Sequence, residues 1–146
     1  MTRINCVPPA LLTDQQLRGE YTEMPRMTSY LKKSYATGRP IAIPIMYKMS
    51  TGHVKFFYDK GLYLKKRYNE LKNEMRRRGM NPKANWSLSL FEHYGLMGDW
   101  TPDPDAIMVN VERIVERIDE IESPKYYGKP ISHDAAKAML LELING

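Results

Sequence analysis

Cysteine is almost absent from this chain, because Cys6 is the only one among 146 residues. A single thiol excludes an internal disulfide and a cysteine-based metal cluster, and it is typical of a reducing compartment. No activating group neighbours Cys6 in the sequence. We therefore interpret Cys6 as a small buried residue rather than as a nucleophile.

Long hydrophobic runs and a secretory leader are also missing. No apolar run approaches membrane-spanning length, and Met1 is followed directly by polar residues instead of a basic and then apolar leader. Hydrophobic residues make up 42% of the chain, which is enough for the core of one domain. We expect a single domain over residues 1–146, located in the cytoplasm and without membrane contact.

Histidine is scarce and scattered, at His53, His93 and His133, and none has a cysteine or carboxylate at metal-ligand spacing. No glycine-rich loop of the kind that cradles phosphate occurs between a strand and a helix. We therefore expect neither a metal nor a cofactor. His53, close to the aromatic run Phe56-Phe57-Tyr58, is interpreted as a packed histidine rather than a catalyst.

Charge is segregated along the chain, although the net charge is only +5. Residues 60–78 contain eight Lys or Arg against two Glu, whereas residues 99–122 contain eight acids against Arg113 and Arg117. This pattern indicates a basic face that binds a polyanion, with a solvated lysine-rich helix as the alternative. On the first interpretation, Arg76, Arg77 and Arg78 are predicted to contact phosphates.

Helical periodicity dominates the rest of the pattern, and it predicts an all-α fold of about three main helices with long irregular connections. The first helix runs from about Thr13, an N-cap with Gln16 as its capping-box partner, to Ala36, with a kink before Pro25. The second covers about 61–78 and the third about 105–121. Residues 39–59 and 80–103 are predicted to be irregular.

A short fourth helix is expected near the C-terminus, where Ser132 provides a cap. It contains the apolar residues Met139, Leu140, Leu143 and Ile144. This apolar face requires a partner, either the domain's own core or a second subunit. We favour the core, and we expect a monomer.

The start of the chain offers a candidate nucleophile. Thr2 is small, so the initiator methionine would normally be trimmed and leave a threonine α-amine. An α-amine titrates near pH ~8, against ~10.4 for lysine, so more of it is unprotonated at neutral pH. Glu23, in Glu20-Tyr21-Thr22-Glu23-Met24-Pro25-Arg26, could supply the acid–base chemistry. On these residues alone, a terminal amine that takes no part in catalysis is the more common outcome.

Motifs along most of the chain change that balance, because they resemble the endonuclease V family of phage pyrimidine dimer DNA glycosylases with AP lyase activity. The resemblance extends from the first residue to about Lys129, and leaves 130–146 as a C-terminal extension. The similar stretches are Thr2-Arg3-Ile4-Asn5, Leu12-Thr13-Asp14-Gln15-Gln16-Leu17, Glu20 to Arg26, Gly52-His53-Val54-Lys55-Phe56-Phe57-Tyr58-Asp59-Lys60, Gly98-Asp99-Trp100 and Lys125-Tyr126-Tyr127-Gly128-Lys129.

The resemblance implies a DNA repair enzyme that acts on damaged double-stranded DNA in a bacterium or a virus-infected cell. Thr2 would attack C1′ and form an imine, and Glu23 would move protons until β-elimination nicks the strand. No cofactor is required, because an imine is itself an electron sink. The residues expected to contact DNA are Arg3, Gln15, Arg26, Lys33, Arg113, Arg117 and Lys125.

Two departures from the family pattern concern the lesion. Thr22 stands where the phage enzyme has an arginine, and Ser123-Pro124 replaces an aromatic pair before Lys125. Cyclobutane pyrimidine dimers are the first choice of substrate. The alternatives are the same chemistry on ring-opened purines or abasic sites, and a DNA-binding protein without catalytic activity.

Overall fold

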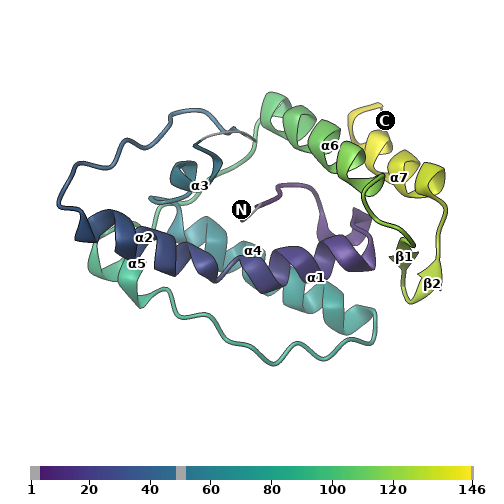
Figure 1. Cartoon of the computed structure of the whole chain (residues 1–146), viewed down its shortest axis with the longest axis horizontal. Coiled ribbons are helices and arrows are strands. Elements are labelled where there is room, and N and C mark those ends of the chain that lie inside the picture. The colour runs from purple at the N-terminus through teal and green to yellow at the C-terminus, as the bar shows by residue number, and fades with distance from the viewer. Residues whose placement is uncertain (1–3, 49–51, 146) are drawn as a thin grey trace.

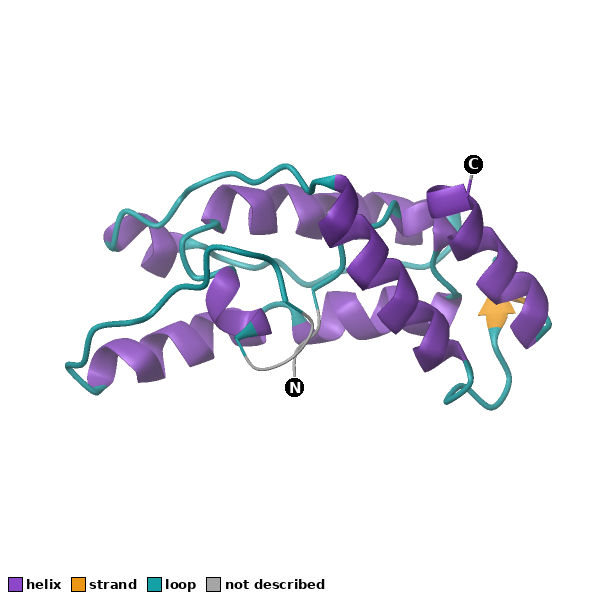
Figure 2. Cartoon of the chain, turned by 90° about the horizontal axis from the view of Figure 1, so that it is seen from above, coloured by secondary structure: helices purple, strands orange, loops and turns teal. Residues whose placement is uncertain are grey.

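The computed structural model describes residues 4–48 and 52–145, and its secondary structure is almost entirely helical, as predicted (Figures 1 and 2). The elements are a 3₁₀ turn (Pro9–Leu11), α1 (Asp14–Glu23), α2 (Arg26–Ala36), α3 (His53–Phe56), α4 (Gly61–Arg77), α5 (Ser89–His93), α6 (Pro104–Ile118), β1 (Lys125–Tyr126), β2 (Lys129–Pro130) and α7 (His133–Asn145). Within the described residues, no helix is both long enough and apolar enough to cross a membrane.

The first predicted helix is divided into α1 and α2, which follow one another in nearly the same direction (Figure 1). Thr13 caps α1 as predicted, and Gln16 completes the capping box by accepting the Thr13 N–H at 3.1 Å. Pro25 has no N–H to donate, so the helix is interrupted just before it. The predicted break at Pro25 is therefore confirmed, while the direction of the chain changes little across it.

Helix α4 packs against α1 and supplies much of the core. Leu64, Leu71 and Met75 are buried on its inner face, and Tyr68 stacks on Tyr21 of α1 with ring centres 5.2 Å apart. The bounds of α4 agree with the predicted helix over 61–78.

Helix α6 forms the opposite side of the molecule and begins at Asp103, whose carboxylate accepts the Ala106 N–H at 2.8 Å. Val111, Ile114 and Ile118 bury its apolar stripe. The predicted helix over 105–121 thus exists, and it ends one turn earlier than expected.

Helix α7 packs along α6, so the expectation that it docks on the chain's own core is confirmed. Ala136 and Leu140 are completely buried. Ser132 Oγ accepts the Ala135 N–H at 3.0 Å, as its predicted capping role requires. An ion pair of 2.6 Å between Lys137 and Asp119 links α7 to the end of α6.

Several short elements were not predicted. Helices α3 and α5 lie in the stretches expected to be irregular, and β1 and β2 form an antiparallel hairpin. A helix of one turn shows no period in the sequence, and strands of two residues show no alternation. In the hairpin, Tyr127 and Gly128 have φ values of 53° and 76°, as the two central residues of a type I′ turn require.

Arg78 anchors this hairpin to the helices. Its guanidinium donates to Glu74 at 2.8 Å and to Asp14 at 2.9 Å, and its side chain is 0% exposed. The same group lies 4.8 Å from the ring centre of Tyr126 and 4.9 Å from that of Tyr127. The prediction that Arg78 contacts phosphate is therefore wrong, because its donors are already committed inside the protein.

The carboxylates that hold Arg78 are stabilised in their charged form. Burial alone would raise the pKa of Asp14, but the Gly128 N–H and the Arg78 guanidinium outweigh it and lower that pKa. Burial and hydrogen bonds compete in the same way at Glu74, where Arg78 and the Tyr127 hydroxyl lower the pKa. Both carboxylates thus stabilise the fold above their ordinary pKa values, and this stabilisation is lost as the pH falls through the lowered values.

Arg78→Ala is expected to lower the free energy of unfolding by about 3–5 kcal/mol, because it leaves the buried Asp14 without a cation and leaves Glu74 with only the exposed Arg77 at 2.9 Å. Arg76→Ala is the matched control, since Arg76 is exposed on the same helical turn and should change stability by less than about 0.5 kcal/mol. Urea denaturation of the two variants measures the difference. Equal stabilities would contradict an anchoring role for Arg78.

Candidate active site

The N-terminal segment, residues 4–7, runs through the interior between α6 and the line of α1 and α2 (Figure 1). Ile4 and Val7 are completely buried. The segment belongs to no helix or strand, so its buried backbone groups require side-chain partners. Thr2, the predicted nucleophile, and Arg3, a predicted DNA contact, lie outside the described residues.

Glu20 of α1 is one such partner. Its carboxylate accepts the Asn5 N–H and the Asn5 amide, each at 3.1 Å. Arg67 of α4 binds the same carboxylate through two donors, at 2.8 and 2.9 Å, and also donates to the Val7 carbonyl. Burial disfavours the charged guanidinium, but the attraction of Glu20 outweighs it and holds the pKa of Arg67 above its ordinary value. Glu20 and Arg67 together fix the segment to α1 and α4.

Asn110 of α6 and Tyr63 of α4 satisfy further groups of the segment. Asn110 Oδ1 accepts the Cys6 N–H at 2.7 Å, and Asn110 Nδ2 donates to Asn5 Oδ1 at 3.1 Å. The Tyr63 hydroxyl donates to the Asn5 carbonyl at 3.0 Å. Burial raises the pKa of Tyr63, so the hydroxyl keeps the proton that it donates. Three helices thereby hold Asn5.

Ile4 is bound at both of its backbone groups. Its N–H donates to His53 Nε2 at 2.8 Å, and its carbonyl accepts from the Tyr47 hydroxyl at 3.1 Å. The other ring nitrogen of His53 lies 2.6 Å from the Lys48 carbonyl. Burial lowers the pKa of His53, even though the Lys48 carbonyl acts in the opposite direction. The expected packed histidine is confirmed, since His53 is 1% exposed. It also satisfies a buried backbone N–H, that of Ile4.

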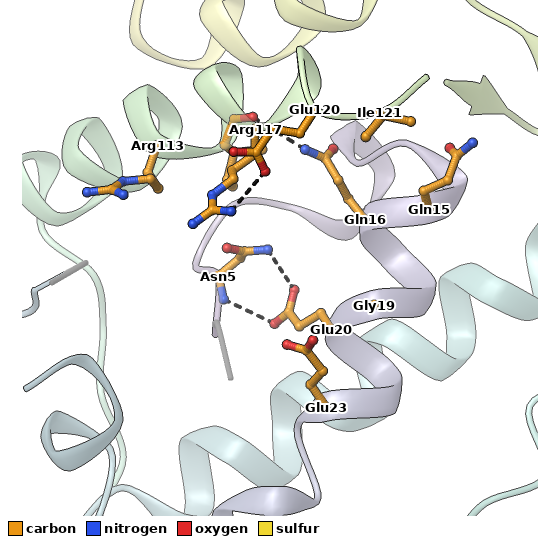
Figure 3. Close-up of a pocket in the computed structure, with 11 residues that line it drawn as sticks. Asn5, Gln15, Gln16, Gly19, Glu20, Glu23, Arg113, Arg117, Glu120 and Ile121 are labelled. Atoms are coloured by element: carbon orange, nitrogen blue, oxygen red, sulfur yellow. Dashed lines mark hydrogen bonds and ion pairs between the residues drawn. The ribbon is translucent and has the colours of Figure 1, made fainter. Parts of the chain in front are cut away.

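An open cavity of about 410 Å³ lies between α1 and α6, next to this segment. Glu23 follows Glu20 by one helical turn, and its side chain points into the cavity beside the Asn5–Glu20 pair (Figure 3). The residues that form the cavity wall are Asn5, Gln15, Gln16, Gly19, Glu20, Glu23, Arg113, Ile114, Arg117, Glu120 and Ile121.

Arg113 and Arg117 form the cationic part of the wall opposite Glu23 (Figure 3). Each side chain is 37% exposed, and each faces a glutamate three residues later, Arg117 at 2.9 Å and Arg113 at 4.0 Å. Exposed pairs of this kind contribute only about 0–1 kcal/mol. Both arginines can therefore replace their glutamate partner by an incoming phosphate. Both line the same cavity as Glu23.

Gln15 also reaches the cavity, where its amide joins α1 to the hairpin. Its Nε2 donates to the Ser123 carbonyl at 2.7 Å, and its Oε1 accepts the Lys125 N–H at 3.0 Å. Lys125 itself is exposed. Gln15 thus places Lys125 near the cavity, while contact of either residue with DNA stays a prediction.

Arg26 and Lys33 lie on α2, away from the cavity wall. Both are exposed, and a separation of seven residues puts them on the same face of the helix. They are suited to phosphates beyond the reaction centre, and this contact also stays a prediction.

The predicted basic face over residues 60–78 is narrower than its composition indicates. Arg67 and Arg78 are buried in ion pairs, and Lys66 pairs with Asp99 at 2.5 Å on the surface. Lys65 and Arg76 are among the exposed cations that remain. Two of the eight expected phosphate-binding charges therefore act inside the protein.

Sequence reasoning missed the role of several residues that build the site, above all Glu20, Arg67 and Asn110. The one available signal was the spacing of Glu20 and Glu23, which puts two carboxylates on one face of α1. Nothing in the sequence distinguishes Arg67 from its exposed neighbours, because its partners lie 47 and 60 residues away.

Cys6, within the segment, is half-buried and donates weakly to the Ala106 carbonyl at 3.8 Å. Burial raises the pKa of Cys6 to about 12, so the thiolate form is negligible at neutral pH. This agrees with the interpretation of Cys6 as unreactive.

Over residues 4–48 and 52–145, no three side chains of His, Cys, Asp or Glu gather where they could hold a metal ion.

A family model described as pyrimidine dimer DNA glycosylase matches residues 1–88. The match includes Thr2, Glu23 and Arg26, the buried Glu20–Arg67 pair, and the His53 that binds Ile4. It covers more than half of the chain, and it ends before α5 and α6. This chain therefore belongs to the pyrimidine dimer DNA glycosylase family, a family of DNA repair enzymes that act on damaged DNA.

Proposed function

We propose that this enzyme excises cyclobutane pyrimidine dimers from double-stranded DNA through an imine on Thr2, and then nicks the strand. The main support is the position of Glu23, which faces a cavity beside the buried start of the chain. Asn5 is bound to Glu20, one turn before Glu23. Thr2 is three residues before Asn5, so the chain length keeps its amine within about 10 Å of Asn5.

The proposed chemistry begins with the unprotonated α-amine of Thr2, after removal of Met1. Its nitrogen forms a bond to C1′ of the damaged nucleoside, the C1′–N bond to the base breaks, and the base takes up a proton while the cyclobutane ring keeps it joined to the neighbouring pyrimidine. Opening of the sugar ring gives a protonated imine. Glu23 stabilises the developing positive charge and transfers protons.

Strand cleavage follows from the same intermediate. Glu23 removes a proton from C2′, the imine accepts the electron pair, and the 3′ phosphate leaves with the C3′–O electrons. Water then hydrolyses the imine and regenerates the amine. The protein groups thus suffice for both steps.

Glu23 is a better candidate for proton transfer than Glu20. Both oxygens of Glu20 already accept hydrogen bonds from Asn5 and Arg67, and its side chain is 1% exposed. Glu23 is half-buried on the cavity wall, where substrate can reach it. The two carboxylates have different functions, one in holding the chain and one in catalysis.

The DNA contacts are proposed in two groups. Arg113 and Arg117 contact phosphates at the lesion, because they line the cavity opposite Glu23. Arg3, Gln15, Arg26, Lys33 and Lys125 contact the backbone around it. Contacts to phosphates orient the duplex without reading its sequence, and distortion at a lesion makes extrusion of a nucleotide easier.

Borohydride trapping tests this proposal on three DNA substrates: ultraviolet-irradiated DNA, DNA with ring-opened purines, and DNA with abasic sites. We expect a covalent adduct on irradiated DNA and on abasic DNA, which peptide mapping assigns to Thr2. An adduct on a lysine would refute the nucleophile. Adducts with ring-opened purines but not with irradiated DNA would support the alternative substrate. No adduct with any substrate, with DNA binding retained, would support the non-catalytic alternative.

A further inference from the structure

We propose that His53 is a positioning residue for the reacting amine: it acts as the neutral Nδ1–H tautomer and accepts the Ile4 N–H through Nε2. This inference rests on the proposed function, because it takes Thr2 as the nucleophile. His53 is not among the residues that line the cavity, and on this proposal it does not contact the substrate. It acts through the chain that leads to Thr2.

The hydrogen bonds determine the tautomer. The backbone N–H of Ile4 can only donate, so Nε2 of His53, 2.8 Å away, has to accept and carries no proton. The carbonyl of Lys48 can only accept, so Nδ1, 2.6 Å away, has to donate. Only the Nδ1–H tautomer satisfies both contacts, and an imidazolium would place two N–H groups against each other at Ile4.

The ring of His53 is held firmly enough to act as a fixed reference. Tyr47 and Phe57 pack edge-on against it, with ring centres 5.6 and 5.5 Å away. Gly52 precedes His53 with φ 98°, and a Cβ at Gly52 would lie 3.2 Å from Cγ of Pro44. A glycine is therefore required to turn the chain so that His53 begins α3 and faces inward.

The distance along the chain explains why this bond matters for the amine. The nitrogen of Ile4 is two residues after the α-amine of Thr2, so the amine lies within about 7 Å of it. A reaction requires the amine to approach C1′ to about 3–3.5 Å, and a displacement of 1 Å can lower a rate by about 100-fold. Holding Ile4 N limits the movement of the amine to rotations about the few bonds between them.

The remaining contacts allow His53 to be tested without dismantling the site. Asn5 keeps its bonds to Glu20, Tyr63 and Asn110, and the Ile4 carbonyl keeps Tyr47. A substitution at His53 that removes the acceptor at Nε2 thus frees the Ile4 N–H, while the rest of the segment stays bound.

Two variants separate the two ends of the imidazole ring. In His53→Gln the side-chain amide reaches the position of Nε2 and its oxygen can accept the Ile4 N–H. In His53→Asn the amide reaches only the position of Nδ1, so it can donate to Lys48 but leaves Ile4 without an acceptor. Both variants lose the aromatic ring, so a packing role alone affects them similarly.

The measurement is the single-turnover rate of trapped imine on an abasic-site duplex, with affinity measured on an uncleavable abasic analogue. Intact mass confirms removal of Met1 in each protein. We expect His53→Asn to form imine about 100-fold more slowly than the wild type, His53→Gln to recover at least tenfold of that loss, and both affinities to stay within about threefold of the wild type. Equal rates in all three proteins, or equal losses in both variants, would overturn the inference.

Nitrogen NMR of the wild-type protein provides a test that does not depend on the variants folding. We expect His53 to show a protonated Nδ1 and a bare Nε2 at neutral pH. A protonated Nε2 would overturn the inference and leave the proposed function intact. A wild-type adduct on a residue other than Thr2 would instead refute the proposed function itself, whatever the tautomer of His53.

Discussion

Glu23→Gln is expected to lower the rate of dimer excision and strand cleavage by about 100- to 10,000-fold, the range typical of general acid–base groups. The substitution keeps the size of the side chain and removes its charge and its proton-transfer function. Damaged DNA should bind as well as before or more tightly, because one negative charge leaves a cavity that is lined by Arg113 and Arg117. Single-turnover cleavage of irradiated DNA and a binding titration measure the two effects separately.

Glu20→Gln is the informative control, because Glu20 lies one turn away on the same helix. This variant leaves the buried guanidinium of Arg67 without its anionic partner, so we expect it to lower the free energy of unfolding by about 3–5 kcal/mol. A loss of stability thus indicates the structural role of Glu20, and a loss of chemical rate indicates the catalytic role of Glu23. If Glu23→Gln nicked DNA at the wild-type rate, Glu23 would have a structural role only.

Extending the N-terminus is expected to reduce cleavage even more, to the level without a protein nucleophile, while leaving DNA binding largely unchanged. Retained Met1 moves the reactive amine by one residue, about 3.8 Å, and acetylation converts the amine to an amide, whose nitrogen is not nucleophilic and cannot form an imine. The chain cannot slide to compensate. His53 and Tyr47 bind the backbone of Ile4, and Glu20 and Asn110 bind the side chain of Asn5.

The matched control for an N-terminal extension is a C-terminal tag of the same length. Helix α7 ends far along the chain from the N-terminal segment and packs on α6. Intact mass identifies the terminus of each preparation, and cleavage of irradiated DNA gives the rate. Undiminished cleavage by a protein with an acetylated terminus would refute the amine mechanism.

Local chemistry was sufficient to predict the helices from the sequence. The capping box of Thr13 and Gln16, the break at Pro25 and the cap at Ser132 depend on residues at most three positions apart. The apolar stripes of α4 and α6 repeat over several turns, so their period is clear. In contrast, α3 and α5 comprise a single turn or little more and show no period.

The roles of the charged residues could not be predicted in this way. Arg67 and Arg76 occupy the same lysine- and arginine-rich helix, yet Arg67 is buried and Arg76 is exposed. The difference depends on Glu20, a partner 47 residues away along the chain. Arg78 was misjudged for the same reason, since Asp14 lies 64 residues away.

The sequence by itself determined the family motifs, the candidate pair Thr2 and Glu23, and the order of the main helices. Only the tertiary structure decided which side chains hold the start of the chain. The bond from Ile4 to His53 spans 49 residues, and that from Cys6 to Asn110 spans 104. The physical reason is that a buried backbone group outside helices and strands requires a polar partner, and packing of the helices alone determines which distant side chain reaches it.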